Sequence, residues 1–354
     1  MTHQQQGDTM SSSEPEFNDA REYSSLEEVM NTLLTAKGKS FRELDQTGRA
    51  LTGGNKGSLG QIIEESVLKY AINSDAAPDI HIGDTSYELK VTPLKHIKKG
   101  KQTSAKERLV IDIINYLTLA DETDFESSKM WDKAKNIILV YYYDDRTDKK
   151  KELRIDCKVL ASYLMKYEAD DLATIKNDWH VIRDKVASGH ADSLSESDTN
   201  YLAACTKGAN SKQLREAPAP AGANTATIFA KQRAFSLKTS YMTAIARKLL
   251  NRKSETVRLP IPQEQNLDEY VAAKFIPYTG KSSRDIASEL QVSAAPTAKN
   301  YNSSLAFAML GASKSSISKI EQFSKANISQ FKSVTIYPDG LPREHMSFKA
   351  ITDD

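Results

Sequence analysis

The pattern that most constrains this chain is a short hairpin at residues 78–90, PDIHIGDTSYELK. Apolar and polar residues alternate on both sides of the Gly-Asp pair at 83–84, and a glycine-first pair suits a two-residue type II′ turn. That turn sets the register so that Asp79 faces Glu88, with Cβ atoms about 5 Å apart. Lys90 projects from the same face as Glu88, because side chains alternate along a strand. The hairpin is therefore expected to present two carboxylates and one ammonium group together.

Two like charges at that spacing repel each other unless a cation lies between them. Carboxylates suit Mg²⁺, which takes few protein carboxylates, keeps several waters and bridges to phosphate oxygens. A lysine beside a metal-bound water can steer or deprotonate it and offset charge on an attacked phosphate. The alternative interpretation is an exposed cross-strand charge cluster without chemistry, because charged residues are common at sheet edges.

The composition of the 354-residue chain is that of a soluble globular protein, with 39% hydrophobic and 27% charged residues. The net charge of +1 implies that any contact with nucleic acid relies on local basic patches. Cys157 and Cys205 lie far apart without nearby histidines, which argues against a zinc site or a disulfide scaffold. Residues 1–22 are expected to form a disordered tail, and the lack of a long apolar run predicts a cytoplasmic protein without membrane contact.

The apolar periodicity predicts an α/β fold with a central mixed sheet flanked by helices. Helical spacing marks residues 26–34, 58–70 and 172–186, and strand patterns mark residues 109–114, 137–143 and 152–159. The second of these helices delivers Glu64 and Glu65 just upstream of the hairpin. A basic run that includes Lys98 and Lys99 follows the hairpin. Such a run is either a solvated loop or, beside a metal site, a segment that attracts phosphate.

A second polar and basic region lies between residues 200 and 250. Its candidate DNA-contacting residues carry groups that base edges and phosphates accept, namely Lys207, Asn210, Ser211, Lys212, Arg215, Arg233, Ser236 and Lys238. The alternative is the solvated rim of a helical lobe. Residues 251–266 contain two prolines and read as an interdomain linker, which separates residues 23–250 from residues 267–354.

The last hundred residues repeat the beginning of the chain. The matched segments are GKSFREL with GKSSRDI, SLGQIIE with SLAFAML, and ELKVTP with FKSVTI. A repeat of this length predicts a second copy of the same fold at 267–354. The copy lacks the charged cluster, since Leu310 stands in the place of Glu64 and Phe331 in the place of Glu88. We therefore expect a catalytically degenerate and apparently incomplete second domain.

These blocks resemble the MutH family, which comprises the mismatch-repair nicking endonuclease and the GATC-cutting type II restriction endonucleases with two MutH-like domains. The carrying motifs are, in order, KGSLGQIIE, PDIHIGDTSYELKVTP, SSKMWDKAKNIILVYY and RAFSLKTSY. The resemblance implies a restriction-endonuclease-like (PD-(D/E)xK) core in residues 23–250 and an inactive copy after residue 267. It also implies a Mg²⁺-dependent deoxyribonuclease.

The family motifs imply a role for each residue of the cluster. Asp79 and Glu88 match the metal-binding carboxylates, and Lys90 matches the motif lysine. Glu64 matches a helix glutamate that helps to complete the metal site, and Lys133 matches a second lysine near the scissile phosphate.

Three positions of this match stay open. Glu65 replaces Glu64 if the helix is rotated, and Lys135 lies close enough to Lys133 to be confused with it. Ser236 stands where MutH has a tyrosine that senses adenine methylation, and Cys205-Thr206 replace a recognition Arg-Pro. These departures favour the restriction-enzyme branch.

The sequence thus predicts a type II restriction endonuclease that binds double-stranded DNA and cuts a short site, GATC by resemblance, leaving 5′-phosphate ends. One site per chain implies that cutting both strands takes two chains or two successive events, so we expect a monomer that can dimerise on DNA. The alternatives are a MutH-type nicking enzyme that answers to a mismatch-sensing partner, and a DNA-binding regulator that does not cleave.

Overall fold

The computed structural model describes residues 22–48, 57–70, 79–97, 102–147, 153–207, 213–250, 256–312, 317–337, 339 and 341–343. The predicted tail up to residue 21 and the candidates Lys98, Lys99, Asn210, Ser211 and Lys212 lie outside these residues. The chain divides into two compact units, one of Met1–Lys95 with Lys133–Met165 and one of His96–Asp132 with Lys166–Asp354.

The first unit begins with short helices whose starts are fixed by side-chain caps. Ser25 caps α1 (Leu26–Leu34), and Ser40 with Glu43 forms a capping box at α2 (Phe41–Leu44). The next helix starts as α3 (Ser58–Gln61) and continues as the π-helix η2 (Ile62–Val67). Helical spacing therefore predicted the position of this helix, but not its π-helical hydrogen bonding.

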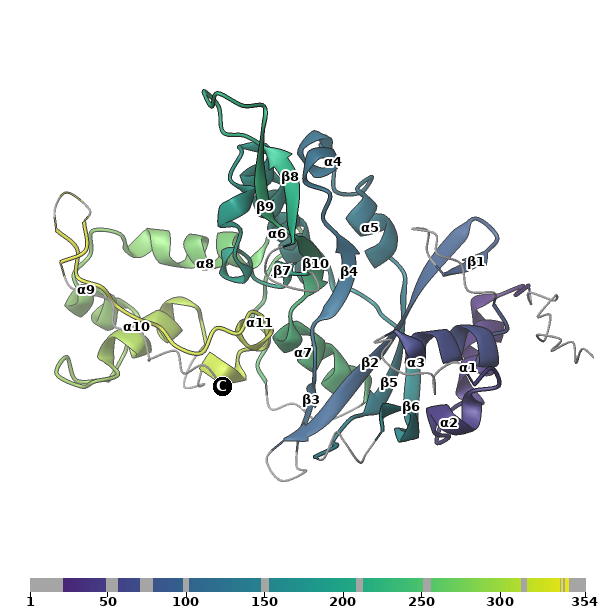
Figure 1. Cartoon of the computed structure of the whole chain (residues 1–354). Helices are drawn as coiled ribbons and strands as arrows, with labels where there is room; N and C mark the ends of the chain where they lie inside the picture. The colour runs from purple at the N-terminus through teal and green to yellow at the C-terminus, as the bar shows by residue number, and fades with distance from the viewer. Residues whose placement is uncertain are drawn as a thin grey trace, which may run out of the picture. The chain divides into compact units, whose positions relative to one another are not determined.

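A mixed sheet forms the other layer of the first unit, as predicted (Figure 1). Its strands are β1 (Ile80–Ile82), β2 (Thr85–Ile97), β5 (Ile137–Tyr143) and β6 (Val159–Leu164), in the order β1-β2-β5-β6. β2 runs antiparallel to β1 and parallel to β5, and β5 runs antiparallel to β6. The predicted strand at 152–159 is wrong in position, because η3 (Arg154–Asp156) turns there and the strand begins at Val159.

One core joins these two layers. Val29 and Leu33 of α1, Phe41 of α2 and Ile63 of η2 are buried, and they belong to the same cluster as alternate residues of the sheet. These sheet residues include Leu89, Ile138, Val140 and Tyr142. β5 is buried along almost its whole length, as its continuous apolar run predicts for a central strand. The helix that carries Glu64 is therefore packed on the sheet that carries the hairpin.

The second unit contains a three-stranded antiparallel sheet and a two-stranded ribbon. The sheet has the order β4-β10-β7, and its strands are β4 (Leu109–Ile113), β10 (Arg233–Leu237) and β7 (Leu202–Thr206). The ribbon pairs β8 (Leu214–Pro218) with β9 (Thr227–Lys231). β3 (Gln102–Ala105) contacts the helix α7 (Thr239–Leu249).

The second unit also contains several helices. They are α4 (Tyr116–Asp121), α5 (Lys129–Ala134), which runs across the boundary between the units, α6 (Ala169–Ala187), α8 (Leu267–Phe275), α9 (Ser283–Glu289), α10 (Tyr301–Met309) and α11 (Glu321–Lys325). Single 3₁₀ turns connect them at Ala191–Ser193, Glu196–Asp198, Ile276–Tyr278 and Ile317–Lys319. None of the helices in the described ranges is long and apolar enough to cross a bilayer.

Buried ionic contacts attach the C-terminal helices to α6. Lys325 of α11 donates to both carboxylate oxygens of Asp171, at 2.8 and 2.7 Å, and both side chains are almost fully buried. Arg258 forms ion pairs with Asp170 and with Glu321. Residues near the predicted linker are therefore packed against α6 and α11.

Candidate active site

The hairpin has the predicted turn and register. Ile82 pairs with Thr85 and Ile80 with Tyr87, so the next pair along the ladder is Asp79 with Glu88. Gly83 has φ of +55°, whereas Asp84 is not among the residues with positive φ, which is the pattern of a type II′ turn. The turn prediction is confirmed.

Asp79 and Glu88 lie on neighbouring strands with different environments. The carboxylate of Asp79 accepts a hydrogen bond of 2.7 Å from the backbone N–H of Leu89, so it lies across the ladder. Glu88 is 5% exposed, and one of its oxygens, Oε1, pairs with the Nζ of Lys90. The other oxygen, Oε2, is buried and accepts no hydrogen bond. A buried carboxylate oxygen without a donor is a free ligand position.

Asn136 fixes the strand that carries Glu88. Its carbonyl accepts the N–H of Glu88 at 2.9 Å, and its side-chain amide donates to the carbonyl of Ser86 at 3.1 Å. Asn136 precedes β5, and the parallel pairing of Glu88 with Ile137 begins directly after it. Sequence reasoning missed this residue, although a polar residue directly before a buried apolar strand is a signal for such a role.

Glu64 faces the hairpin from the π-helix. Burial, together with the charges of Asp79 and Glu88, raises the pKa of its carboxyl to about 7, while Lys90 opposes this shift. Three residues of the hairpin thus act on this one side chain. Of the two candidates, Glu64 is the glutamate whose charge is coupled to the hairpin, and Glu65 is 9% exposed. A π-helical segment at this point fits the frequent occurrence of such segments at functional sites.

Lys133 also belongs to this electrostatic group. Burial raises the pKa of Glu88, whereas Lys90 lowers it and Lys133 lowers it from the last turn of α5. Lys133 is half-buried, and Lys135 is exposed. Of these two lysines, Lys133 is therefore the one whose charge acts on Glu88.

These acids suit a cation that needs few protein ligands. Among the residues described, no group of three histidine, cysteine, aspartate or glutamate side chains stands ready to hold a metal ion. Mg²⁺ needs fewer, because it commonly binds one or two carboxylates and completes its shell with water and phosphate oxygens. Oε2 of Glu88 offers one such position, and Asp79 lies opposite it with one oxygen engaged by Leu89.

The other predicted residues that the structure describes lie in the second unit, near its three-stranded sheet. Lys207, directly after β7, and Arg215, in β8, are both exposed. The Nε of Arg215 donates a hydrogen bond to the side chain of Gln232 at 3.0 Å. Gln232 holds both segments, because its carbonyl also accepts the N–H of Lys207 at 2.9 Å. These two exposed cations thus share contacts with one glutamine.

Three further candidates are buried or half-buried. Arg233 donates to the carbonyl of Ala204 at 2.7 Å, and Lys238 donates to the carbonyl of Thr199. Ser236 has no exposed surface, because it lies in the central strand β10. Direct contact between Ser236 and DNA would require this strand to move.

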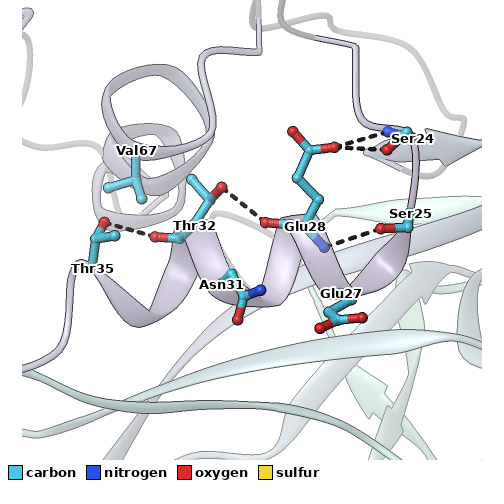
Figure 2. A pocket seen from close by; sticks show the side chains of 8 residues that line it. All are labelled: Ser24, Ser25, Glu27, Glu28, Asn31, Thr32, Thr35 and Val67. Carbon is cyan, nitrogen blue, oxygen red and sulfur yellow. Dashed lines mark hydrogen bonds between the residues drawn. The ribbon is translucent and has the colours of Figure 1, made fainter.

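A polar pocket of about 640 Å³ lies along α1, and none of the predicted site residues lines it (Figure 2). Its hydroxyl groups are engaged within the helix and its cap. Ser24 donates to Glu28 at 3.0 Å, Thr32 to the carbonyl of Glu28 at 2.9 Å, and Thr35 to the carbonyl of Thr32 at 2.7 Å. These contacts serve to start and hold α1, and we assign no ligand to the pocket.

The fold and the side chains together define a class of protein. It is an α/β protein whose mixed sheet carries two acids and a lysine on one hairpin, with a glutamate contributed by a neighbouring helix. The family model for the DNA mismatch repair enzyme MutH matches residues 68–178, which include Asp79, Glu88, Lys90 and Lys133. Residues 68–178 of this chain are therefore similar to MutH.

Two relatives show how far the similarity extends. The type II restriction enzyme Sau3AI of Staphylococcus aureus is 35% identical over 336 residues, which cover 93% of this chain and 65% of that enzyme. The DNA mismatch repair protein MutH of Shewanella woodyi is 26% identical over 225 residues, which cover 62% of this chain and 90% of that protein. The chain thus spans 65% of the length of the restriction enzyme and extends beyond the part that it shares with MutH.

Proposed function

We propose that this protein is a type II restriction endonuclease, which hydrolyses phosphodiester bonds of double-stranded DNA in the presence of Mg²⁺. The observation that carries the proposal is the arrangement of Asp79, Glu88 and Lys90 on one hairpin, where Oε2 of Glu88 is buried without a donor, and the charges of this hairpin act on Glu64 of the packed helix. The similarity to a type II restriction enzyme over 93% of this chain supports it. An ordinary exposed hairpin cluster would not have a buried glutamate at its centre.

The proposed metal site consists of Asp79 and Glu88, with Glu64 completing it from the helix. A bound Mg²⁺ would supply Lewis-acid activation of water and neutralise charge on the phosphate. Lys90 is held beside Glu88 by their ion pair, so its ammonium group is positioned to orient the attacking water. Lys133 lies near enough to act on Glu88, and its charge would stabilise the developing negative charge of the phosphate. The products would carry 5′-phosphate and 3′-hydroxyl ends.

Plasmid cleavage in Mg²⁺ tests this proposal. Asp79→Asn keeps an oxygen that can accept the N–H of Leu89 but removes the charge, so we expect loss of cleavage with a folded protein. Asp84→Asn removes an exposed carboxylate from the turn of the same hairpin, and we expect it to cut like the wild type. Lys90→Ala is expected to abolish cutting while duplex binding survives. Cleavage retained by Asp79→Asn or Lys90→Ala would refute the assignment.

We further propose that the recognised site is GATC, which the sequence predicts by resemblance. Among the predicted residues, Lys207 and Arg215 are exposed cations close to β10, and they would contact base edges or phosphates. Mapping the cleaved ends on a plasmid of known sequence, with and without adenine methylation, tests the site and the effect of the methyl group. Ends that fall at another sequence would disprove GATC recognition.

Similarity to MutH favours a second candidate, a nicking enzyme of mismatch repair that depends on a partner. The two functions differ in what the purified protein does alone. Rapid unaided cleavage of both strands would support the restriction enzyme, whereas slow nicking that needs added repair proteins would support the alternative. Binding without any cleavage would support a DNA-binding regulator. Because each chain is proposed to carry one site, two-strand cutting should depend on protein concentration if two chains assemble on DNA.

We also propose that residues 267–354 are a degenerate second MutH-like copy. Helix order supports this, since Asn266 caps α8 and Ser282 caps α9 as Ser25 and Ser40 cap the first two helices. Leu310, which stands in the place of Glu64, is 1% exposed. Such a copy would bind a second half-site or a second duplex. A binding stoichiometry of two duplexes per chain, measured by sedimentation, would support the second of these, and one duplex per chain would exclude it.

A further inference from the structure

The outer face of the ribbon carries a diagonal apolar stripe. In the register of β8 with β9, Leu214 lies opposite Lys231, and Phe229 lies opposite Glu216. Leu214 is therefore a diagonal neighbour of Phe229, and Pro218 lies on the other diagonal of the same face. Leu214 is 50% exposed and Phe229 is 68% exposed. A contiguous stripe on one face differs from a single exposed hydrophobic residue, which would need no explanation.

The inner face of the ribbon is fixed to the unit. Ala217 and Ala230 point inward and are buried, and β8 packs against α4 and α6. The hydroxyl of Tyr116 in α4 donates to the carbonyl of Lys231 at 2.5 Å. The small alanines let the ribbon lie close to the helices. The outer stripe is thus presented by a supported element.

The charged residues around the stripe favour a polyanion as its binding partner. Lys231 shares the outer face. Arg215 projects from the other face of β8, opposite Ala230, but it is exposed and donates to Gln232, whose carbonyl accepts the N–H of exposed Lys207. Glu216 is the acid of the outer face, and it accepts a hydrogen bond of 3.0 Å from Thr227. A two-stranded ribbon has the size that the major groove of DNA admits, and an apolar side chain there contacts the C5-methyl group of thymine.

We propose that the outer face of β8–β9 enters the major groove of double-stranded DNA, with Phe229 packed against thymine methyl groups. This inference rests on the proposed function and adds an apolar specificity contact to it. A second copy of the chain is the other possible occupant. The stripe of three side chains is small for a stable dimer, which needs about 800 Å² from each partner.

Cleavage kinetics of Phe229→Ala in Mg²⁺ test the proposal. Burying a phenylalanine contributes about 1.5–3 kcal/mol, so KM for a short GATC duplex is expected to rise between about tenfold and a hundredfold while kcat stays unchanged. The salt dependence of KM should keep its slope, because no charge is lost, whereas Lys231→Ala should reduce that slope by about one. Leu34→Ala is the matched control, since Leu34 is 61% exposed on α1, outside the proposed sites. Unchanged KM in Phe229→Ala would overturn the proposal.

Replacing every thymine of the duplex by deoxyuridine tests the methyl contact directly. Loss of one buried methyl group is expected to raise the KM of the wild type about fourfold, and to leave Phe229→Ala almost unaffected. Equal effects on both proteins would overturn the contact. If the wild type cuts neither the thymine nor the deoxyuridine duplex, the proposed function is refuted. If wild type and Phe229→Ala both cut the two duplexes with the same KM, only the ribbon proposal is refuted. Sedimentation without DNA should be identical for both, and a dimer that Phe229→Ala dissociates would assign the stripe to a chain–chain interface.

Discussion

Replacing Lys325 by methionine is expected to destabilise the protein more than any exposed charge replacement. The Nζ of Lys325 lies 2.7 and 2.8 Å from the two oxygens of Asp171, with side chains 3% and 0% exposed. Removing one partner of a buried pair costs about 3–5 kcal/mol, because the remaining charge is left without compensation. That is a large part of a typical stability of about 5–15 kcal/mol, and it corresponds to a melting temperature lower by roughly 10 °C.

The loss should depend on pH through Asp171. Burial raises the pKa of Asp171, and Lys325 opposes that shift, so removing Lys325 raises the pKa further. When the pKa of a carboxyl group is higher in the folded than in the unfolded protein, the group stabilises the fold at pH values below its pKa in the unfolded protein. This stabilisation is lost as pH rises through its pKa in the folded protein. The deficit of Lys325→Met should therefore be smaller near pH 5 than near pH 7.5. Glu321, which lies 2.8 Å from Lys325, and the ring of Tyr241 are the other groups that face the ammonium.

Urea unfolding at the two pH values measures this deficit, and two further variants control it. Lys281→Met breaks an exposed pair with Glu289 in the same unit, so we expect a cost below about 1 kcal/mol. Adding Asp171→Asn to Lys325→Met should recover part of the stability, since the uncompensated charge is then absent. A cost of Lys325→Met similar to that of Lys281→Met, or one independent of pH, would refute the reasoning.

Three other outcomes are expected. Gly189→Ala should lower the free energy of unfolding by several kcal/mol, and Gly222→Ala by only about 1 kcal/mol, although both glycines have φ near +80°. The difference arises because only the Cβ at 189 would meet the backbone N of Pro220, at 2.2 Å. Equal melting temperatures of the two variants would show that the loop moves to accommodate the Cβ. Asp178→Asn should cost about 2–3 kcal/mol in urea unfolding, since its carboxylate accepts three backbone N–H groups at 2.8, 2.6 and 2.9 Å, and an unchanged midpoint would contradict this. Mg²⁺ at a hundred times its Kd should stabilise the wild type by about 2.7 kcal/mol, and EDTA should remove this stabilisation. The stability of Glu88→Gln should change with neither Mg²⁺ nor EDTA. An equal stabilisation of wild type and Glu88→Gln by Mg²⁺ would show that the ion binds elsewhere.

The hairpin was predictable because its determinants are local. Alternating residues set two strands, and Gly83 supplies the positive φ that a type II′ turn requires. The pairing of Ile82 with Thr85 then fixes every later pair, including the approach of Asp79 to Glu88. The apolar run of β5 was predictable for the same reason, since its residues alone identify a buried strand.

Features that depend on distant packing were not predictable. The spacing of Ile62, Ile63 and Val67 is that of a regular helix, and only contact with the sheet selects π-helical bonding there. The strand after Arg154 was placed too early, because a turn at 154–156 cannot be read from an apolar alternation that continues through it. The partner of Asp171 lies 154 residues away, and the sequence holds no local sign of it.

The prolines at 260 and 262 show what composition conceals. They predict a linker, yet Leu259 beside them is 3% exposed, and its N–H donates to Gln322 of α11 at 3.0 Å. The amide of Gln322 in turn donates to Asp170 of α6 and to the carbonyl of Leu259. Proline excludes regular structure but does not prevent burial when a neighbouring side chain satisfies the backbone. Deleting residues 267–354 would therefore remove Gln322 and Lys325 from a packed unit, so the role of the proposed second copy is better tested by point substitutions on its exposed surface than by truncation.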